Sequence, residues 1–264
     1  MDIWVKDITT IKESSSPIEE ALTIIFKSIA KDNWKEDNLF KKIITSTEFN
    51  SGNKFQNQYK TASVMYSCFY LLKHEIQKGF EQHLVALIFA SLFHNFKHKG
   101  GMNKYVFENE KHAIEQMYEF ATASDFIKLW GKHPWMSLKN MPSWVNLTDA
   151  LEEIILVADF SDTKNIATDY VRNPESLWRA DLPLQINRLK QIFLESLLLC
   201  NVMEPFLFEE NKKMLEENGT TFKSDALNRQ IKIFLQNFAS NVYISKASIK
   251  LNVQEAIQYN TVRL

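Results

Sequence analysis

The scarcity of glycine and proline is the feature that most narrows the folds open to this chain. Its 264 residues include only 6 glycines and 6 prolines, whereas average proteins contain about 7% glycine and about 5% proline. Because these two residues end helices and form tight turns, so small a number favours long helices. We therefore predict an all-α protein, folded as a compact multi-helix domain.

Helical periodicity supports this prediction. Apolar residues recur at the spacing of one helix face at Leu151, Ile154, Ile155 and Ala158. Thr148 is the predicted N-cap of that helix, and Pro17, followed by acidic residues, predicts another helix start. We expect an N-terminal helical arm or subdomain over residues 1–50 and a main domain over residues 51–264, most simply as one continuous domain.

The charge of the chain is nearly balanced. Its 31 basic and 32 acidic side chains give a net charge of -1, so no broad electrostatic attraction to nucleic acid or an anionic membrane is expected. No apolar run approaches the roughly 18 residues of a membrane span, and the first residues lack the form of a signal peptide. We expect a soluble, cytoplasmic protein in which Cys68 and Cys200, both in apolar sequence, stay reduced.

An apolar run leads directly into a group of polar residues. The run from Leu84 to Phe93 predicts a buried helix that ends near His94, whose side chain would face the interior. The pattern that follows is His94-Asn95-x-x-His98-x-Gly100-x-x-Asn103. Two histidines four residues apart share one helical face, and imidazole is a common metal ligand, but such a pair alone does not define a site.

The longer pattern resembles the motif of the HD hydrolases and, with its final Gly-x-x-Asn, that of the class I cyclic-nucleotide phosphodiesterases. Asn95 stands where that motif has an aspartate. An upstream segment resembles the family's Tyr-His-Asn-x-x-His followed by Val. In this chain Gln56 and Lys60 replace both histidines, and Asn57 and Val64 are kept.

The resemblance implies a role for each of these positions. Gln56 occupies the general-acid position, and a glutamine cannot complete acid catalysis because it has no titratable proton near neutral pH. His98 is the other candidate catalytic residue. Lys60 occupies a metal-ligand position, where an ammonium group repels a divalent cation. His94 would remain a metal ligand, and Asn95 a weakened one that coordinates only through its carbonyl oxygen.

Later segments extend the resemblance. An apolar helix that runs into Ala-Asp-Phe-Ser implies Asp159 as the last metal ligand, and Asp181, in a similar pattern, is the alternative. Gln230 and Phe234 resemble the glutamine and phenylalanine that contact the nucleotide base in the family. Asn103 is a further candidate for substrate binding.

These replacements change the charge of the implied metal site. The intact family holds its first ion with two histidines and two aspartates, and here only His94 and Asp159 remain as strong ligands. The change of an aspartate to Asn95 and the gain of Lys60 together shift the local charge by about two units against a cation. We therefore expect either one divalent metal (Mg, Mn or Zn) or none. Lys60 can instead pair with Asp159 and hold the pocket together without metal.

Three functions are consistent with these residues. The first is a phosphodiesterase-like protein with a degenerate metal site and lost or altered hydrolysis, which binds a nucleotide or another small phosphate ligand. The second is a cyclic-nucleotide phosphodiesterase, a phosphoric diester hydrolase that uses a reduced metal site. The third is a helical interaction scaffold, with a contact loop that contains Trp130, Trp135 and Trp144. For these tryptophans, burial in the core is the alternative.

Overall fold

The structure, a computed structural model, describes most but not all of the chain. The described residues are 3–29, 37–46, 49, 57–75, 81–98, 107–123, 125–133, 143–158, 186–203 and 253–263, with single residues at 229, 232 and 236. Their secondary structure is helical, and no strand occurs among them. The prediction of an all-α fold is confirmed.

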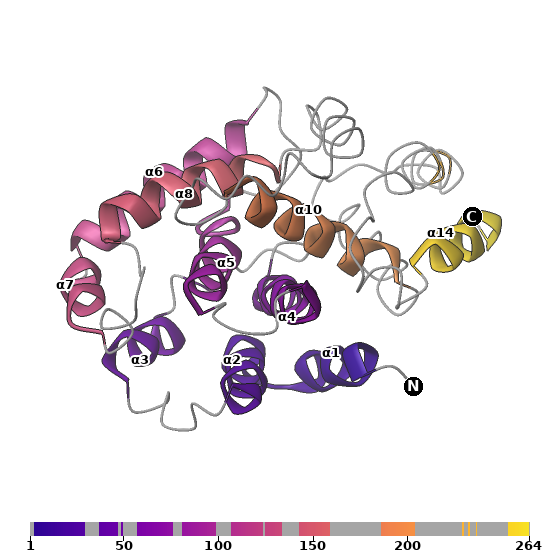
Figure 1. The fold of residues 1–264 in the computed structure, drawn as a ribbon, viewed down its shortest axis with the longest axis horizontal. Helices are drawn as coiled ribbons and strands as arrows, with labels where there is room; N and C mark the ends of the chain where they lie inside the picture. The colour runs from indigo at the N-terminus through magenta and orange to yellow at the C-terminus, as the bar shows by residue number, and fades with distance from the viewer. Residues whose placement is uncertain are drawn as a thin grey trace.

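The described helices run in chain order from α1 to α14. They are α1 (Ile3–Glu13), α2 (Pro17–Ser28), α3 (Asn38–Thr45), α4 (Gln58–Glu75), α5 (Glu81–Phe93), α6 (Glu108–Ala123), α7 (Phe126–Gly131), α8 (Trp144–Leu156), α10 (Ile186–Val202) and α14 (Val253–Arg263). In Figure 1, helix α4 lies inside the bundle, between α5, α10, α1 and α2.

Helix α4 is enclosed by its neighbours. It packs against α1, α2, α5 and α10, and every residue from Tyr59 to Leu72 is buried. Small polar residues such as Ser63 and Ser67 are accommodated because their hydroxyl groups find partners; Ser63, for example, donates to the carbonyl of Tyr59 at 2.8 Å. A helix that is buried on all sides forms the core of a domain rather than its surface.

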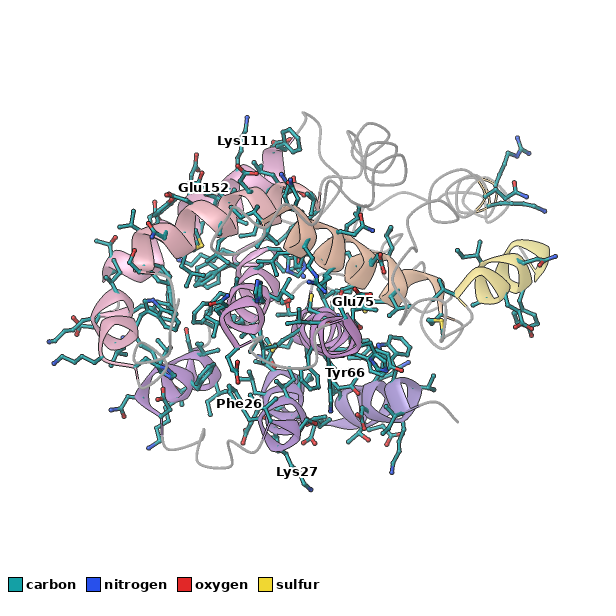
Figure 2. All side chains as sticks on the ribbon, viewed as in Figure 1. Phe26, Lys27, Tyr66, Glu75, Lys111 and Glu152 are labelled. Atoms are coloured by element: carbon teal, nitrogen blue, oxygen red, sulfur yellow. The ribbon has the colours of Figure 1, made fainter. Side chains whose placement is uncertain are left out.

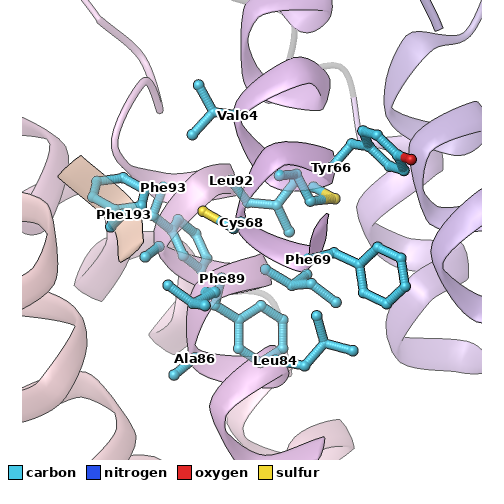
Figure 3. Packing of buried hydrophobic residues seen from close by; sticks show 14 of the residues in the cluster. Val64, Tyr66, Cys68, Phe69, Leu84, Ala86, Phe89, Leu92, Phe93 and Phe193 are labelled. Carbon is cyan, nitrogen blue, oxygen red and sulfur yellow. The ribbon is translucent and has the colours of Figure 1, made fainter. Parts of the chain in front are cut away.

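Helix α5 supplies the aromatic part of the core. All its residues from His83 to Phe93 are buried, as the apolar run predicted. The Phe89 ring lies 5.4 Å from the ring of Phe126 and 5.5 Å from that of Trp130, both in edge-to-face geometry. Figure 3 shows Phe89 and Phe93 of α5 in the same buried cluster as Phe193 of α10.

The outer helices cover this core. Helices α6 and α8 pack against each other and run along one edge of the molecule in Figure 1, with α7 beside them. The exposed Lys27 and Lys111 side chains point outward in Figure 2. None of the described helices combines the length and the apolar character required to cross a membrane.

The N-terminal helices share the core of the later ones. Trp4 in α1 is fully buried, and its Nε1 donates to Ser67 Oγ in α4 at 3.1 Å. Tyr66 donates its hydroxyl proton to Asp7 at 2.5 Å and so joins the same two helices. The buried core is continuous across residue 50. The division into an N-terminal arm or subdomain and a main domain therefore stays a prediction.

One predicted helix start is confirmed by the structure, and one predicted N-cap is wrong. Pro17 is the first residue of α2, as predicted. The predicted N-cap Thr148 lies instead inside α8, where its hydroxyl bonds to the carbonyls of Trp144 and Val145. Ser143 is the N-cap, and its Oγ accepts from the amide of Asn146 at 3.3 Å. Serine and threonine have similar capping propensity, so the cap is set by where the chain enters the core.

The cysteines and two of the tryptophans are core residues. Cys68 and Cys200 are buried free thiols, as predicted, and burial raises the pKa of Cys68 to about 12. Trp130 and Trp144 are buried, so the proposed contact loop is wrong for both. Trp135 lies outside the described residues.

Candidate functional site

The polar motif begins where α5 ends. The amide of His94 still donates to the carbonyl of Ala90 at 2.9 Å, and the amide of His98 donates to the carbonyl of Asn95 at 3.2 Å. Between them, Lys97 has a positive φ of 51°, which turns the chain away from the helix axis. His94 therefore lies at the end of a buried helix, as predicted.

The His94 ring has a defined orientation. Its Nδ1 lies 2.7 Å from the carbonyl oxygen of Ser91. A carbonyl only accepts hydrogen bonds, so Nδ1 carries the proton and Nε2 carries a lone pair. The Phe193 ring lies 5.4 Å away in edge-to-face geometry. Burial is the main cause that lowers the pKa of His94 to about 3, and the interactions with His98 and Lys60 act in the same direction, so the ring is neutral near pH 7.

Asn95 is buried immediately beside it in the sequence. Its side chain is 5% exposed, and no hydrogen-bond partner for its Nδ2 is present among the described residues. A buried amide group without a partner costs about 1–3 kcal/mol. The residue at the position of the motif aspartate is therefore neutral, buried and a hydrogen-bond donor.

The start of α4 carries the second part of the motif. Asn57 caps this helix: its Oδ1 accepts from the amide of Lys60 at 3.0 Å, and its carbonyl accepts from the amide of Thr61 at 3.1 Å. Val64 is fully buried in the core. Both residues therefore have structural roles that explain their place in the motif.

Lys60 is buried close to the end of α5. Its side chain is 4% exposed, which is uncommon for a lysine. Its charge acts on His94, so the structure brings together these two predicted site residues from α4 and α5. Lys60 therefore adds a positive charge close to His94.

His98 lies nearer the surface and extends the same group of basic residues. It is partly buried, and burial lowers its pKa to about 4, with a smaller effect from the nearby His112 of α6. Lys97 beside it is exposed, and its Nζ lies 5.4 Å from the centre of the Phe96 ring.

The remaining predicted site residues lie outside the described part of the chain. These are Gln56, Asn103, Asp159, Asp181, Gln230 and Phe234. Their roles stay predictions from the resemblance.

The residues described at this site do not fit a divalent metal. No group of three or more His, Cys, Asp or Glu side chains that could hold an ion occurs among the described residues. Asn95 is a neutral ligand at best, and the ammonium of Lys60 opposes a cation.

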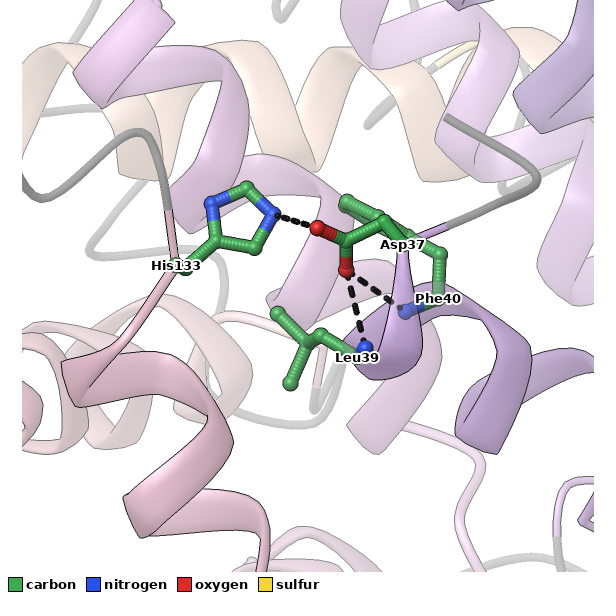
Figure 4. Close-up of polar contacts among 4 residues, drawn as sticks. All are labelled: Asp37, Leu39, Phe40 and His133. Carbon is green, nitrogen blue, oxygen red and sulfur yellow. Dashed lines mark hydrogen bonds and ion pairs between the residues drawn. The ribbon is translucent and has the colours of Figure 1, made fainter. Parts of the chain in front are cut away.

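Sequence reasoning missed a polar contact between distant residues. Nε2 of His133, at the end of α7, lies 3.1 Å from Oδ2 of Asp37, at the start of α3. The other oxygen of Asp37 accepts from the amides of Leu39 and Phe40 at 2.8 and 3.4 Å (Figure 4). Asp37 before an apolar run is a recognisable N-cap, but nothing in the sequence pairs it with His133.

A second polar group lies where α4, α5 and α10 meet. Arg188 of α10 bonds to Glu75 of α4 at 3.4 Å, and Gln191 donates to the buried Glu195 at 2.9 Å. His83 of α5 lies within electrostatic range of Arg188. The sequence carries no motif that marks this group.

The arrangement of helices is similar to that of two solved structures, one of which is a phosphodiesterase domain. The structure is similar to the phosphodiesterase domain of the RhoPDE fusion protein from the choanoflagellate Salpingoeca rosetta, with a TM-score of 0.71 and 13% identity over 97% of this chain and 96% of that one. It is also similar to LmjPDEB1, solved in complex with IBMX, with a TM-score of 0.65 and 12% identity over 97% of this chain and 89% of that one. No protein-family model and no curated protein matches the sequence. At this level of identity the likeness establishes a phosphodiesterase-like fold.

Proposed function

We propose that this phosphodiesterase-fold protein binds a nucleotide or another small phosphate ligand in the cytoplasm, and that its classical two-metal hydrolysis is lost or strongly altered. The observation that carries the proposal is the burial of Lys60 within electrostatic range of His94. A buried ammonium group attracts phosphate oxygens and repels the cation that two-metal hydrolysis requires.

The other replacements support the same conclusion. Asn95 contributes no negative charge where a carboxylate would hold the metal. Gln56, by resemblance at the general-acid position, has no proton to give to a leaving oxygen. Lys60 and Asn95 can thus bind an anion, and neither they nor Gln56 can activate water.

One observation favours a second candidate, a cyclic-nucleotide phosphodiesterase that uses a reduced metal site. His94 donates through Nδ1 to a carbonyl and so presents a lone pair on Nε2, which is the orientation of a metal-ligating histidine. His94 and Asp159 would then hold one ion.

Metal content, binding and turnover measured on the same purified protein separate these candidates. We expect no stoichiometric Mg, Mn or Zn by elemental analysis and no hydrolysis of cyclic AMP or cyclic GMP. We also expect nucleotide or phosphate binding in EDTA that Lys60→Met weakens. Lys73→Met, which replaces an exposed lysine in the same helix, is the matched control and should bind normally. Metal-dependent turnover that His94→Ala abolishes would establish the second candidate. Absence of both binding and turnover would leave the third function, a helical interaction scaffold, as the remaining candidate.

A further inference from the structure

The hydrogen-bond donors and acceptors of the site restrict which phosphate ligand it can bind. Asn95 provides a donor. Its Nδ2 is buried and lacks a hydrogen-bond partner among the described residues. An acceptor oxygen brought by a ligand would remove the cost of leaving this group unpaired.

His94 provides an acceptor. The Ser91 carbonyl takes the proton on Nδ1 at 2.7 Å, so Nε2 can only accept. The ring is 6% exposed, and burial of this kind disfavours the charged form of a histidine. A ligand that satisfies Nε2 must therefore carry a proton of its own.

Basic side chains lie within electrostatic range of His94. Lys60 and His98 both act on His94, and His112 acts on His98. These side chains come from α4, from the turn after α5 and from α6. The positive charge of the buried Lys60 favours an anion beside His94.

We propose that the ligand of this site is a phosphate monoester or inorganic phosphate bound without metal, and that a cyclic phosphodiester is discriminated against. This inference rests on the proposed function. Lys60 and the Asn95 amide would donate to phosphoryl oxygens, and His94 Nε2 would accept the proton of the P–OH group.

The discrimination follows from the protons of the two ligands. A phosphate monoester has a second pKa near about 6 and carries a P–OH proton in part of its population near neutral pH. A cyclic phosphodiester has no P–OH, so every phosphoryl oxygen is an acceptor. Such a ligand would place a negatively charged oxygen against the lone pair of His94, which is unfavourable.

Calorimetric titration in EDTA at pH 6.5 with 5′-AMP, cyclic AMP and inorganic phosphate tests the inference, because the first two share base and ribose. We expect 5′-AMP and inorganic phosphate to bind, and cyclic AMP to bind at least about tenfold more weakly. Cyclic AMP that binds as tightly as 5′-AMP would overturn the inference and leave the proposed function standing. Absence of binding by all three would overturn both.

Two variants test whether the ligand binds at this site. Asn95→Asp preserves the shape of the side chain and replaces a donor amide by an anion, so binding should fall at least about tenfold. Lys60→Met should give a similar loss, and Lys73→Met should not. Circular dichroism checks that each variant is folded. Wild-type affinity in both folded site variants would overturn the inference.

Discussion

Asp37 links the start of α3 to the end of α7, and the variant Asp37→Asn should separate its two roles. One carboxylate oxygen caps α3, and the other contacts Nε2 of His133 at 3.1 Å. Asparagine caps a helix about as well as aspartate, but its amide nitrogen cannot accept a hydrogen bond from His133. The variant therefore keeps the cap and removes this hydrogen bond, while the rings of Phe40 and His133 stay in contact.

The structure gives the expected size of this effect. His133 is 7% exposed, and its ring stacks on that of Trp130 at 5.8 Å, so it cannot turn to solvent without disturbing the core. Loss of a hydrogen bond that leaves a buried partner unsatisfied costs about 1–3 kcal/mol. We expect Asp37→Asn to lower the free energy of unfolding by about 2 kcal/mol. Asp37→Ala should lower it by about 3 kcal/mol, since it also removes the cap.

Urea denaturation followed by circular dichroism measures both changes, and pH provides a further check. Burial on its own raises the pKa of Asp37, but the hydrogen bond and charge of His133 and the two backbone amides outweigh it, so the pKa lies below its usual value. A depressed pKa in the folded state gives stability above the unfolded value of about 3.9, and that stability is lost as pH falls. The difference between wild type and Asp37→Asn should therefore be full near neutral pH and shrink below about pH 4.

Asp125 provides a matched control. It is an exposed N-cap residue whose side chain makes no capping bond, and its φ of 57° suits asparagine. Asp125→Asn should change stability by no more than about 0.5 kcal/mol. If Asp37→Asn proves as mild as this control, the contact with His133 does not stabilise the fold and the reasoning fails.

Three further predictions concern the core and the site. His83 is buried and its ring nitrogens lack hydrogen-bond partners among the described residues; burial, helped by a nearby arginine, lowers its pKa to about 4. His83→Leu should therefore raise the urea concentration at the midpoint of unfolding. The increase should be larger at pH 5 than at pH 7, because the wild-type protein loses stability as pH falls below about 6.5. An unchanged or lower midpoint would contradict this prediction. Phe89→Ala removes a ring packed against several other aromatic rings and should cost about 3–5 kcal/mol in urea denaturation, so a loss below about 1 kcal/mol would show that the packing is wrong. The combined change Gln56→His, Lys60→His and Asn95→Asp should restore Mn binding in a calorimetric titration. If it does not, the assignment of these three residues to the motif positions is wrong.

The sequence predicts the parts of the fold that depend on local pattern. The apolar run before His94 requires burial on every face, and α5 is buried as that run predicts. Pro17 has a fixed φ suited to the first turn of a helix, and α2 begins there. Thr148 shows the limit of such reasoning, because a threonine hydroxyl can bond within a helix as well as cap one.

The site was harder to predict because it depends on contacts between distant segments. The resemblance placed Lys60 and His94 in one site, and the structure brings them within electrostatic range. The unpartnered Nδ2 of Asn95 depends on the packing of the turn after α5, which no motif encodes. Likewise, Asp37 and His133 are brought together only by the contact of α3 with α7.

The enclosure of α4 has a consequence for the exchange of its amide protons with solvent. Because every residue from Tyr59 to Leu72 is buried, no local opening can expose these amides without separating α4 from the helices around it. Their exchange should therefore report the global unfolding of the domain. Lys60 lies on the first turn of this helix and is itself buried, so exposing its side chain to solvent requires this end of α4 to move away from its neighbours.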